Sequence, residues 1–213
     1  MVKLKLNVPV IGILRGVEAS FFSSVMETSF QEGLESIEVT INTENALNMV
    51  ATNRARVPQG KLLGMGTIRN REEAKNAINA GAMFLVTPNY DPEVIKYANS
   101  HRIPVIAGAL TPTEIYAAWR SGAAMIKVFP CQAMGGAQYI KDLRGPFDQI
   151  PLVAVGGVTA ENLPAYISAG VQAVGVSSSL FGRSALAEKN IALLAVNVKN
   201  FIKNYLELKQ KLD

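Results

Sequence analysis

Short runs of consecutive apolar residues recur along the chain, and each is followed by a stretch in which apolar residues are spaced as on one helix face. Strands that are apolar throughout are typical of burial on both faces, as in a parallel sheet. The predicted strands are residues 8–14, 36–41, 61–66, 83–87, 103–107, 124–129, 151–155 and 173–176. The predicted helices are residues 20–31, 44–52, 71–80, 92–100, 112–120, 138–143 and 160–168, with a last helix from about 184 to 212.

Eight strand–helix units in 213 residues predict an α/β protein, a single-domain (β/α)8 TIM barrel near the lower size limit of that architecture. A doubly wound open sheet is the alternative. We expect residues 1–213 to form one domain, because no proline- or serine-rich linker and no shift in composition divides them. With 49% hydrophobic and 18% charged residues, the composition excludes a disordered chain.

Four segments share one near-repeat, in which a glycine precedes a strand at the position of a left-handed residue that ends a helix. These glycines are Gly33, Gly81, Gly122 and Gly170. Five positions after them stand Glu38, Val86, Lys127 and Gly175, and seven positions after them stand Thr40, Pro88, Phe129 and Ser177. Each set comes from alternate strands, so we predict two side-chain layers inside the barrel, the second nearer its C-terminal mouth. Gly175 is expected to leave a hole beside Lys127.

Lys127 and Glu38 therefore share one predicted layer. An ionised lysine in a barrel interior is costly unless paired, and its pKa tends to fall. A neutral Lys127 amine can attack a ketone to form a Schiff base, with Glu38 moving protons to and from the carbinolamine and the substrate hydroxyl. The iminium then allows a nearby C–C bond to break, which is aldol chemistry that needs no metal. The alternative is a buried ion pair that only fixes the strand register.

Two loops carry the residue types of a phosphate site. Gly156 and Gly157 follow the seventh predicted strand and let backbone N–H groups approach an anion, while Thr159 is placed to cap the next helix. Ser177, Ser178 and Ser179 follow the eighth strand and add hydroxyl and N–H donors. The loops after strands seven and eight are the usual place for a phosphate in a TIM barrel. Plain turn chemistry is the alternative for either loop taken alone.

The runs IEVTIN, GMGTIRN, VTPN, GALTPTE, MIKVFPCQAMGG and AVGGVTAEN, together with the loop around Ser178, follow one another between residues 8 and 181. In this order they resemble the class I aldolase family of 2-keto-3-deoxy-6-phosphogluconate and 4-hydroxy-2-oxoglutarate aldolases. The resemblance implies a cytoplasmic homotrimeric lyase of carbohydrate metabolism, of the Entner–Doudoroff type. Such an enzyme releases pyruvate from a keto-deoxy sugar acid phosphate and needs no cofactor or metal.

The resemblance also implies residue roles. Lys127 matches the Schiff-base lysine and Glu38 the general acid/base. The matching substrate-binding residues are Thr67 near the pyruvyl carboxylate, Pro88 and Phe129 in the pocket walls, and Gly156, Gly157 and Ser178 at the phosphate.

Positions 42 and 155 depart from the best-known phosphogluconate enzymes. Asn42 stands where they have an arginine, and Val155 where they have a threonine; both are similar to the branch that acts on the C4 epimer, 2-keto-3-deoxy-6-phosphogalactonate. Arg15, within ILRG, also resembles that branch. We hypothesise that Arg15 supplies the positive charge that Asn42 cannot, against the alternative of a surface arginine.

Composition limits the other function classes. One cysteine, Cys131, and one histidine, His101, exclude an intrachain disulfide and the usual Cys-rich or His-pair metal centres. The longest charge-free stretch, residues 162–182, is interrupted by proline and glycine, so no membrane span is expected, and no signal-peptide cleavage site is found. The net charge is +4, but the basic residues are scattered, so no nucleic-acid partner is expected.

Two other readings remain open at this stage. The first is another sugar-phosphate barrel enzyme, such as an epimerase or a synthase, which shares the phosphate loops but needs no poised lysine. The second is a non-catalytic phosphosugar sensor that kept the fold. Lys127 and Glu38 in one layer argue against both, since a sensor has no use for a buried amine beside a base.

Overall fold

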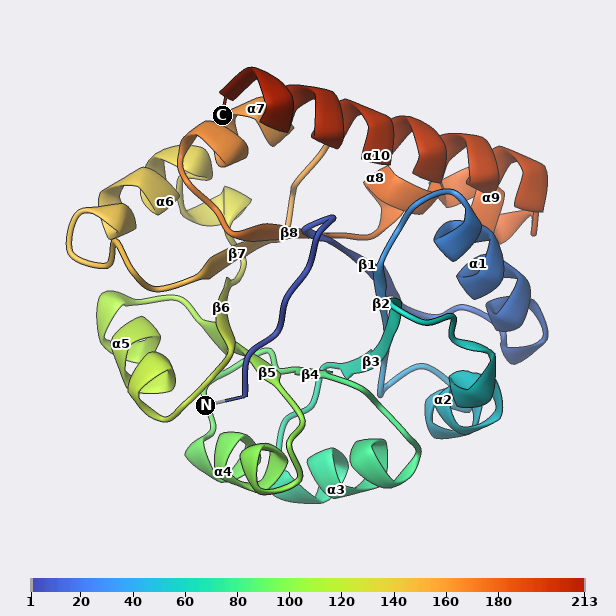
Figure 1. The fold of residues 1–213 in the computed structure, drawn as a ribbon, viewed down its shortest axis with the longest axis horizontal. Coiled ribbons are helices and arrows are strands. Elements are labelled where there is room, and N and C mark those ends of the chain that lie inside the picture. The colour runs from blue at the N-terminus through green and yellow to red at the C-terminus, as the bar shows by residue number, and fades with distance from the viewer. Residues whose placement is uncertain (1, 213) are drawn as a thin grey trace.

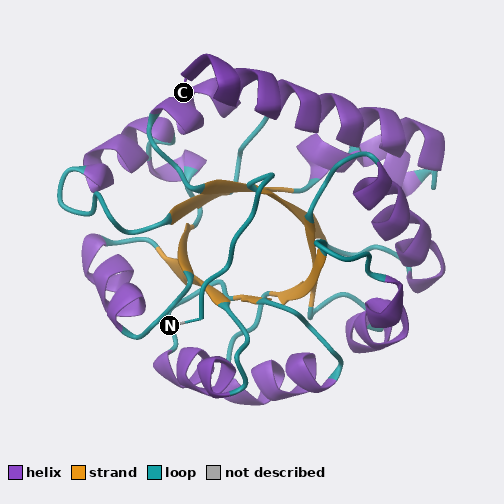
Figure 2. Ribbon diagram, viewed as in Figure 1, coloured by secondary structure: helices purple, strands orange, loops and turns teal. Residues whose placement is uncertain are grey.

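The computed structural model describes residues 2–212, and its centre is a closed barrel of parallel strands in the order β1 to β8 (Figures 1 and 2). The predicted TIM barrel is confirmed, because consecutive strands are neighbours all around the ring and β8 pairs with β1. The strands are β1 Val10–Leu14, β2 Ser36–Thr40, β3 Leu62–Gly66, β4 Leu85–Val86, β5 Val105–Ala109, β6 Met125–Val128, β7 Leu152–Val155 and β8 Ala173–Val176.

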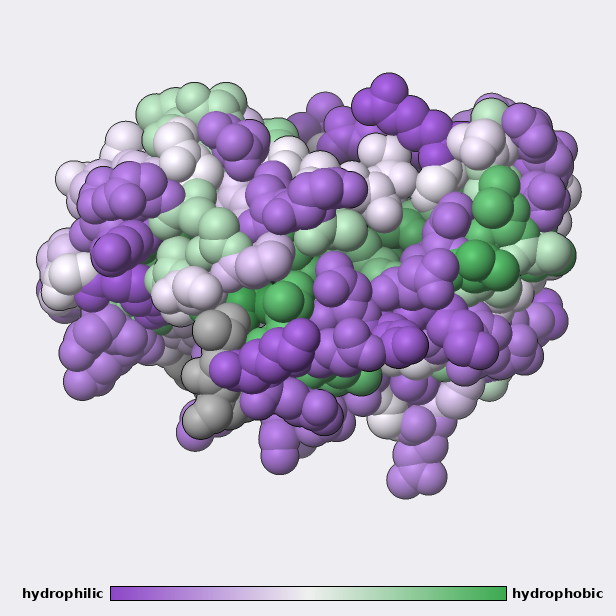
Figure 3. All heavy atoms as spheres, turned by 90° about the horizontal axis from the view of Figure 1, so that it is seen from above, coloured by the Kyte–Doolittle hydropathy of each residue, from purple (hydrophilic) through white to green (hydrophobic). Residues whose placement is uncertain are grey.

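Helices surround the barrel as an outer ring, with the long α10 lying across one side (Figure 1). They are α1 Ala19–Gln31, α2 Ala46–Asn53, α3 Arg71–Asn79, α4 Pro92–Ser100, α5 Pro112–Arg120, α6 Ala137–Arg144, α7 Leu163–Ser168, α8 Ser178–Phe181, α9 Arg183–Ala187 and α10 Ile191–Leu212. Two short 3-10 helices, η1 Arg54–Arg56 and η2 Gln132–Met134, complete the elements. On the side of the molecule where α10 lies, the surface carries mostly hydrophilic side chains, with smaller hydrophobic areas between them (Figure 3).

The predicted last helix is wrong as a single element, because residues 188–190 interrupt it between α9 and α10. Lys189 has a φ of 54°, a left-handed conformation that a continuous helix does not contain. The side chain of Asn190 then accepts a hydrogen bond from the backbone N–H of Leu193 at 3.0 Å, as an N-cap does. The chain thus ends one helix and starts another within three residues.

Local sequence explains where the helices of the ring begin and end. The four glycines of the near-repeat all have positive φ, between 84° and 98°, so the predicted left-handed helix ends are confirmed. At the start of α5, Thr111 and Glu114 form a reciprocal capping box. At the start of α7 the outcome differs from the prediction, because the helix begins at Leu163 and the Thr159 hydroxyl accepts from the Asn162 N–H at 3.4 Å, one turn before it.

Glycines inside the barrel make room for the larger side chains beside them. In the strand register Glu38 lies opposite Gly64, and Lys127 lies opposite Gly108. A Cβ at Gly64 would come within 2.5 Å of the Phe84 ring, and a Cβ at Gly66 within 2.5 Å of the Glu38 carboxylate. The barrel can therefore hold a phenylalanine and a glutamate in its interior only because β3 presents no side chain at these two positions.

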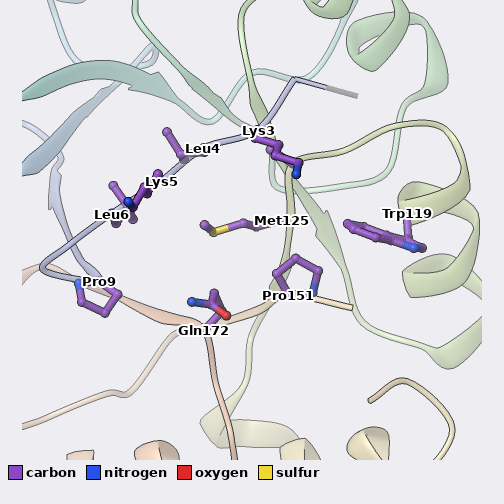
Figure 4. A pocket seen from close by; sticks show the side chains of 10 residues that line it. Lys3, Leu4, Lys5, Leu6, Pro9, Trp119, Met125, Pro151 and Gln172 are labelled. Carbon is purple, nitrogen blue, oxygen red and sulfur yellow. The ribbon is translucent and has the colours of Figure 1, made fainter. Parts of the chain in front are cut away.

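Residues 3–6, which we call the strap, cross the barrel at the N-terminal ends of the strands (Figures 1 and 4). Leu4 and Leu6 pack against the apolar cluster inside the barrel, while Lys3 and Lys5 are exposed. The Glu35 carboxylate anchors the segment that follows by accepting the N–H groups of residues 7 and 8, at 2.9 and 3.0 Å. The strap covers a cavity of about 460 Å³ whose wall includes Trp119 and Met125 (Figure 4).

Among residues 2–212 no helix is long and apolar enough to span a bilayer.

Candidate active site

A cavity of about 490 Å³ opens at the C-terminal ends of the strands, opposite the strap. Its walls come from β1, β2, β6, β7 and β8 and from the loops that follow them. All but two of the predicted site residues line it: Arg15, Glu38, Lys127, Phe129, Gly156, Gly157 and Ser178. The structure thus brings a lysine, a carboxylate and two glycine- or serine-rich loops from distant parts of the chain into one space.

Lys127 lies on β6 and is only 5% exposed. Burial lowers the pKa of Lys127 below its ordinary range; Glu38 opposes this shift, and Arg15 adds to it. The Lys127 Nζ lies 4.9 Å from the centre of the Phe129 ring, at the edge of the cavity. The lowered pKa makes the neutral, nucleophilic form of the Lys127 amine easier to reach than for an exposed lysine.

Glu38 lies on β2 and is 1% exposed. Burial raises the pKa of Glu38 to about 7, although the positive charges of Lys127 and Arg15 act in the opposite direction. Within the described part of the chain, the Glu38 Oε2 atom is buried without a hydrogen-bond partner. A carboxyl group with this pKa can both accept and donate a proton near pH 7.

Lys127 and Glu38 affect each other's pKa without direct contact. No ion pair joins them among residues 2–212, where the ion pairs involve other side chains. The alternative is a buried ion pair that fixes the strand register, and the two side chains do not form the ion pair that it requires. Both residues instead line the same cavity.

The loop after β7 has the open backbone that an anion site requires. Gly156 and Gly157 have φ values of 94° and 84°, where side chains are strained. A Cβ at Gly157 would come within 2.4 Å of Gln132, so this position has no room for one. The Asn162 side-chain amide donates to the Gly157 carbonyl at 2.8 Å and holds the loop. The serines that follow β8, the strand next to β7, lie at the beginning of α8 and also line the cavity.

Two predicted residues, Thr67 and Pro88, are not among those that line the cavity. Thr67 follows β3 and has a φ of 61°. Pro88 follows β4, and its carbonyl group would be only 2.5 Å from a Cβ at Gly108. Both are half-buried at the same end of the barrel, and their roles stay predictions.

The expected hole at Gly175 is partly filled. A Cβ there would come within 2.8 Å of Val155 and 3.1 Å of Ile13, so these two side chains occupy the space. Gly175 lines the cavity together with both of them. Gly175 is predicted to lie beside Lys127, whereas the strand register sets it opposite Val155 on β7 and Ile11 on β1.

Some lining residues were not predicted, and Arg183 is the most notable of them. It is exposed at the first position of α9, in the region where one long helix was expected. No motif in the sequence marks it, because its place at the cavity depends on how α8 and α9 are joined.

Cys131 and His101 both lie outside the cavity. Cys131 is fully buried, and burial raises the pKa of its thiol. His101 is exposed at the end of α4, where its Nδ1 lies 2.9 Å from the Tyr97 carbonyl oxygen.

Comparisons with known proteins show what the whole chain is similar to. The profile of a family described as KDPG and KHG aldolase matches residues 2–196. The 2-dehydro-3-deoxy-6-phosphogalactonate aldolase of Escherichia coli (strain K12) is 32% identical, with 92% of this chain and 95% of the relative covered. A native KDPGal structure superposes with a TM-score of 0.90 at 30% identity, covering 98% of this chain and 99% of the other. A KDPG aldolase from Legionella pneumophila, solved with pyruvate as a covalent carbinolamine, has a TM-score of 0.84 at 26% identity and covers 91% and 93%.

Proposed function

Since the chain belongs to the KDPG and KHG aldolase family, we propose that it is a class I aldolase in which Lys127 forms the Schiff base and Glu38 transfers the protons. The reaction cleaves a six-carbon 2-keto-3-deoxy-6-phospho sugar acid to pyruvate and glyceraldehyde 3-phosphate. The same site would also cleave 4-hydroxy-2-oxoglutarate to pyruvate and glyoxylate. The buried, unpaired Lys127 facing the same cavity as Glu38 is the observation that carries the proposal.

The reaction begins with attack of the neutral Lys127 amine on the C2 ketone. This forms a C–N bond and a carbinolamine, and loss of its hydroxyl group as water, with a proton supplied by Glu38, gives the iminium. The Glu38 carboxylate then removes the proton of the C4 hydroxyl. As that O–H bond breaks, its electrons form the aldehyde carbonyl, the C3–C4 bond breaks, and the electron pair moves onto the iminium to give an enamine.

The second half of the reaction returns the enzyme to its starting state. A proton from Glu38 adds to C3 of the enamine, which regenerates an iminium that is now the imine of pyruvate. Water then adds to C2, and cleavage of the C–N bond releases pyruvate and the free Lys127 amine. The pKa of Glu38, about 7, suits a group that must alternate between acid and base.

The substrate-binding roles follow from the position of each residue around the cavity. Gly156, Gly157 and Ser178 would bind the phosphate through backbone N–H and hydroxyl donors. Phe129 would form a wall, and Thr67 and Pro88 keep the roles that the resemblance implies. Arg15 is exposed, and its charge acts on both Glu38 and Lys127, which supports a role for it in binding an anionic substrate group. If Arg15→Ala left KM unchanged for both pyruvate and the phosphorylated substrate, this role would be wrong.

We infer that the galactonate epimer is the preferred substrate. Val155 lies in the cavity wall, while Asn42 is exposed and is not a lining residue. The E. coli relative and the native KDPGal structure also bear the galactonate name. Side-by-side kcat/KM values for the two epimers test this inference. A preference for the gluconate epimer above about tenfold, roughly 1.4 kcal/mol in the transition state, would overturn it.

Trapping with pyruvate and sodium borohydride, followed by peptide mapping, tests the central proposal. We expect a stable adduct on Lys127 that disappears in Lys127→Ala and persists in Lys141→Ala, because Lys141 is an exposed lysine on α6 outside the cavity. Absence of an adduct in the folded wild type would remove the aldolase mechanism and favour an epimerase, synthase or sensor.

The resemblance also supports a homotrimer in the cytoplasm. Light scattering coupled to size-exclusion chromatography tests the assembly, and a monomer at micromolar concentration would contradict it.

A further inference from the structure

Two cavities meet at the mouth of the barrel and share four residues: Arg15, Ser177, Ser178 and Arg183. The first is the catalytic cavity, and the second, of about 360 Å³, extends outward over α1 and α9. Arg183 therefore lies at their boundary, beside the serines proposed to bind the phosphate. It does not belong to any motif that the sequence analysis assigned.

Arg183 is free to bind a ligand. In the described part of the chain, its guanidinium makes no ion pair, whereas its neighbour Lys189 is held by Glu18 at 2.6 Å. Lys189 lines only the outer cavity. An arginine without a protein partner can direct its planar fork of N–H donors to an incoming anion.

The catalytic cavity has more basic than acidic groups. Arg15, Lys127 and Arg183 line it, and Glu38 is its only acidic residue. A substrate with a carboxylate at one end and a phosphate dianion at the other complements this excess of positive charge. Lys127 reacts with the ketone, so the arginines remain to bind the anionic ends.

The chain fixes Arg183 at this boundary through the residues on both sides of the junction between α8 and α9. The Asn197 side chain, from α10, donates to the Phe181 carbonyl at 3.0 Å. Gly182 has a φ of 83°, and a Cβ there would be 2.3 Å from the Asn197 Nδ2. The close approach of Asn197 thus requires glycine at 182, and the sharp turn there starts α9 at Arg183 beside the serines.

We propose that Arg183 binds the phosphomonoester end of the substrate and determines the preference for phosphorylated over unphosphorylated 2-keto-4-hydroxy acids. The proposal rests on the aldolase function proposed above. Backbone N–H groups and serine hydroxyls supply neutral hydrogen bonds to the phosphate, and the Arg183 guanidinium adds a charged, bidentate contact. Asn197 and Gly182 act as positioning residues for this contact.

The test compares wild type with Arg183→Ala on the phosphorylated substrate and on 4-hydroxy-2-oxoglutarate. We expect the ratio of the two kcat/KM values to fall by about tenfold or more, the size of a lost hydrogen bond between charged groups. The loss should lie in the KM of the phosphorylated substrate, and the inhibition constant of inorganic phosphate should rise in parallel. Arg183→Lys should recover part of the ratio, since it keeps the charge but loses the fork.

Lys189→Gln is the matched control, because it removes one exposed positive charge from the same mouth without touching the catalytic cavity. The ratio should stay near the wild-type value. An unchanged ratio in Arg183→Ala, or an equal fall for both substrates, would overturn the proposal.

The pyruvate–borohydride adduct distinguishes the two possible failures. An adduct in Arg183→Ala with an unchanged substrate ratio overturns only the role of Arg183. A wild type that forms no adduct overturns the proposed aldolase function.

Discussion

Glu38 and Lys127 are both buried, and each favours the charged form of the other, but by less than burial disfavours that form. Burial is the largest influence on both pKa values, and it favours a protonated Glu38 and a neutral Lys127. For the proposed mechanism, the barrel interior thus prepares one proton donor and one nucleophile before any substrate binds. This arrangement has measurable consequences for activity and for stability.

The pH dependence of cleavage should report the ionisation of Glu38. Removal of the C4 hydroxyl proton needs the carboxylate, and the pKa of Glu38 is about 7, so kcat should rise with pH through that value. In Glu38→Gln this limb should vanish, and kcat should fall by about 10²- to 10⁴-fold. Coupled lactate dehydrogenase assays between pH 5 and 9 measure both effects. A wild-type profile that is flat around pH 7 would contradict the assigned role.

Glu38 should also make stability depend on pH. Its pKa rises from 4.5 to about 7 on folding, so between these values the folded protein binds more protons than the unfolded chain. The free energy of unfolding should therefore fall as pH rises, by up to about 3 kcal/mol from this group. Urea unfolding of wild type and Glu38→Gln at pH 5 and pH 8 isolates the contribution. If the difference between the two proteins is the same at both pH values, the interpretation is wrong.

Strand β3 shows how one element controls a catalytic group on its neighbour. Gly66 ends β3, and a Cβ there would meet the Glu38 carboxylate. Gly66→Ala should displace that carboxylate and lower kcat by about 10-fold or more, in the way that small misplacements affect catalysis. Gly145→Ala is the control, because its nearest neighbour would be 3.4 Å away, so its kcat should not change. Equal kcat values for the two variants would disprove the steric role of Gly66.

The spacing of apolar residues does not predict the break between α9 and α10. Its signals are local, with a left-handed residue at 189 followed by an asparagine N-cap at 190, and they interrupt the apolar spacing too briefly to show in it. Asn190→Ala should lower the free energy of unfolding by about 1 kcal/mol through the lost cap. Thermal unfolding measures this change, and steady-state kinetics should show an unaltered kcat. A Tm equal to that of wild type would mean that the cap contributes nothing.

For the molecule as a whole, the order of the eight strands could be predicted because continuous apolar runs and left-handed glycines recur at regular intervals. Lys127 and Glu38 could be predicted to line one site because each follows its near-repeat glycine by five positions. Arg183 could not, since its position depends on the hydrogen bond that Asn197 of α10 donates to the Phe181 carbonyl in the turn before α9. The filling of the space at Gly175 by Val155 and Ile13 depends in the same way on three-dimensional packing.

A substitution at the strap end of the barrel should change the free energy of unfolding without changing catalysis at the other end. Leu6 packs on the interior cluster at the strap, at the opposite end from the cavity that holds Lys127. Leu6→Ala should lower the free energy of unfolding by about 1–2 kcal/mol, as expected for a half-buried leucine, with kcat/KM unchanged. Chemical denaturation and pyruvate-release kinetics measure the two quantities. If kcat/KM fell under conditions in which the variant is still folded, the two ends of the barrel would be coupled.

The strap also determines how the enzyme can be attached to other objects. The Val2 N–H donates to the Asn99 side chain at 3.4 Å, near the end of α4, so a linker added before this residue leaves the molecule at the strap end of the barrel. In the proposed function, substrate enters at the opposite end, through the mouth of the cavity that Lys127 and Glu38 line. A carrier protein or solid support joined through an N-terminal linker would hold the barrel with its mouth facing the solution, so immobilisation by this route should not hinder substrate entry or product release.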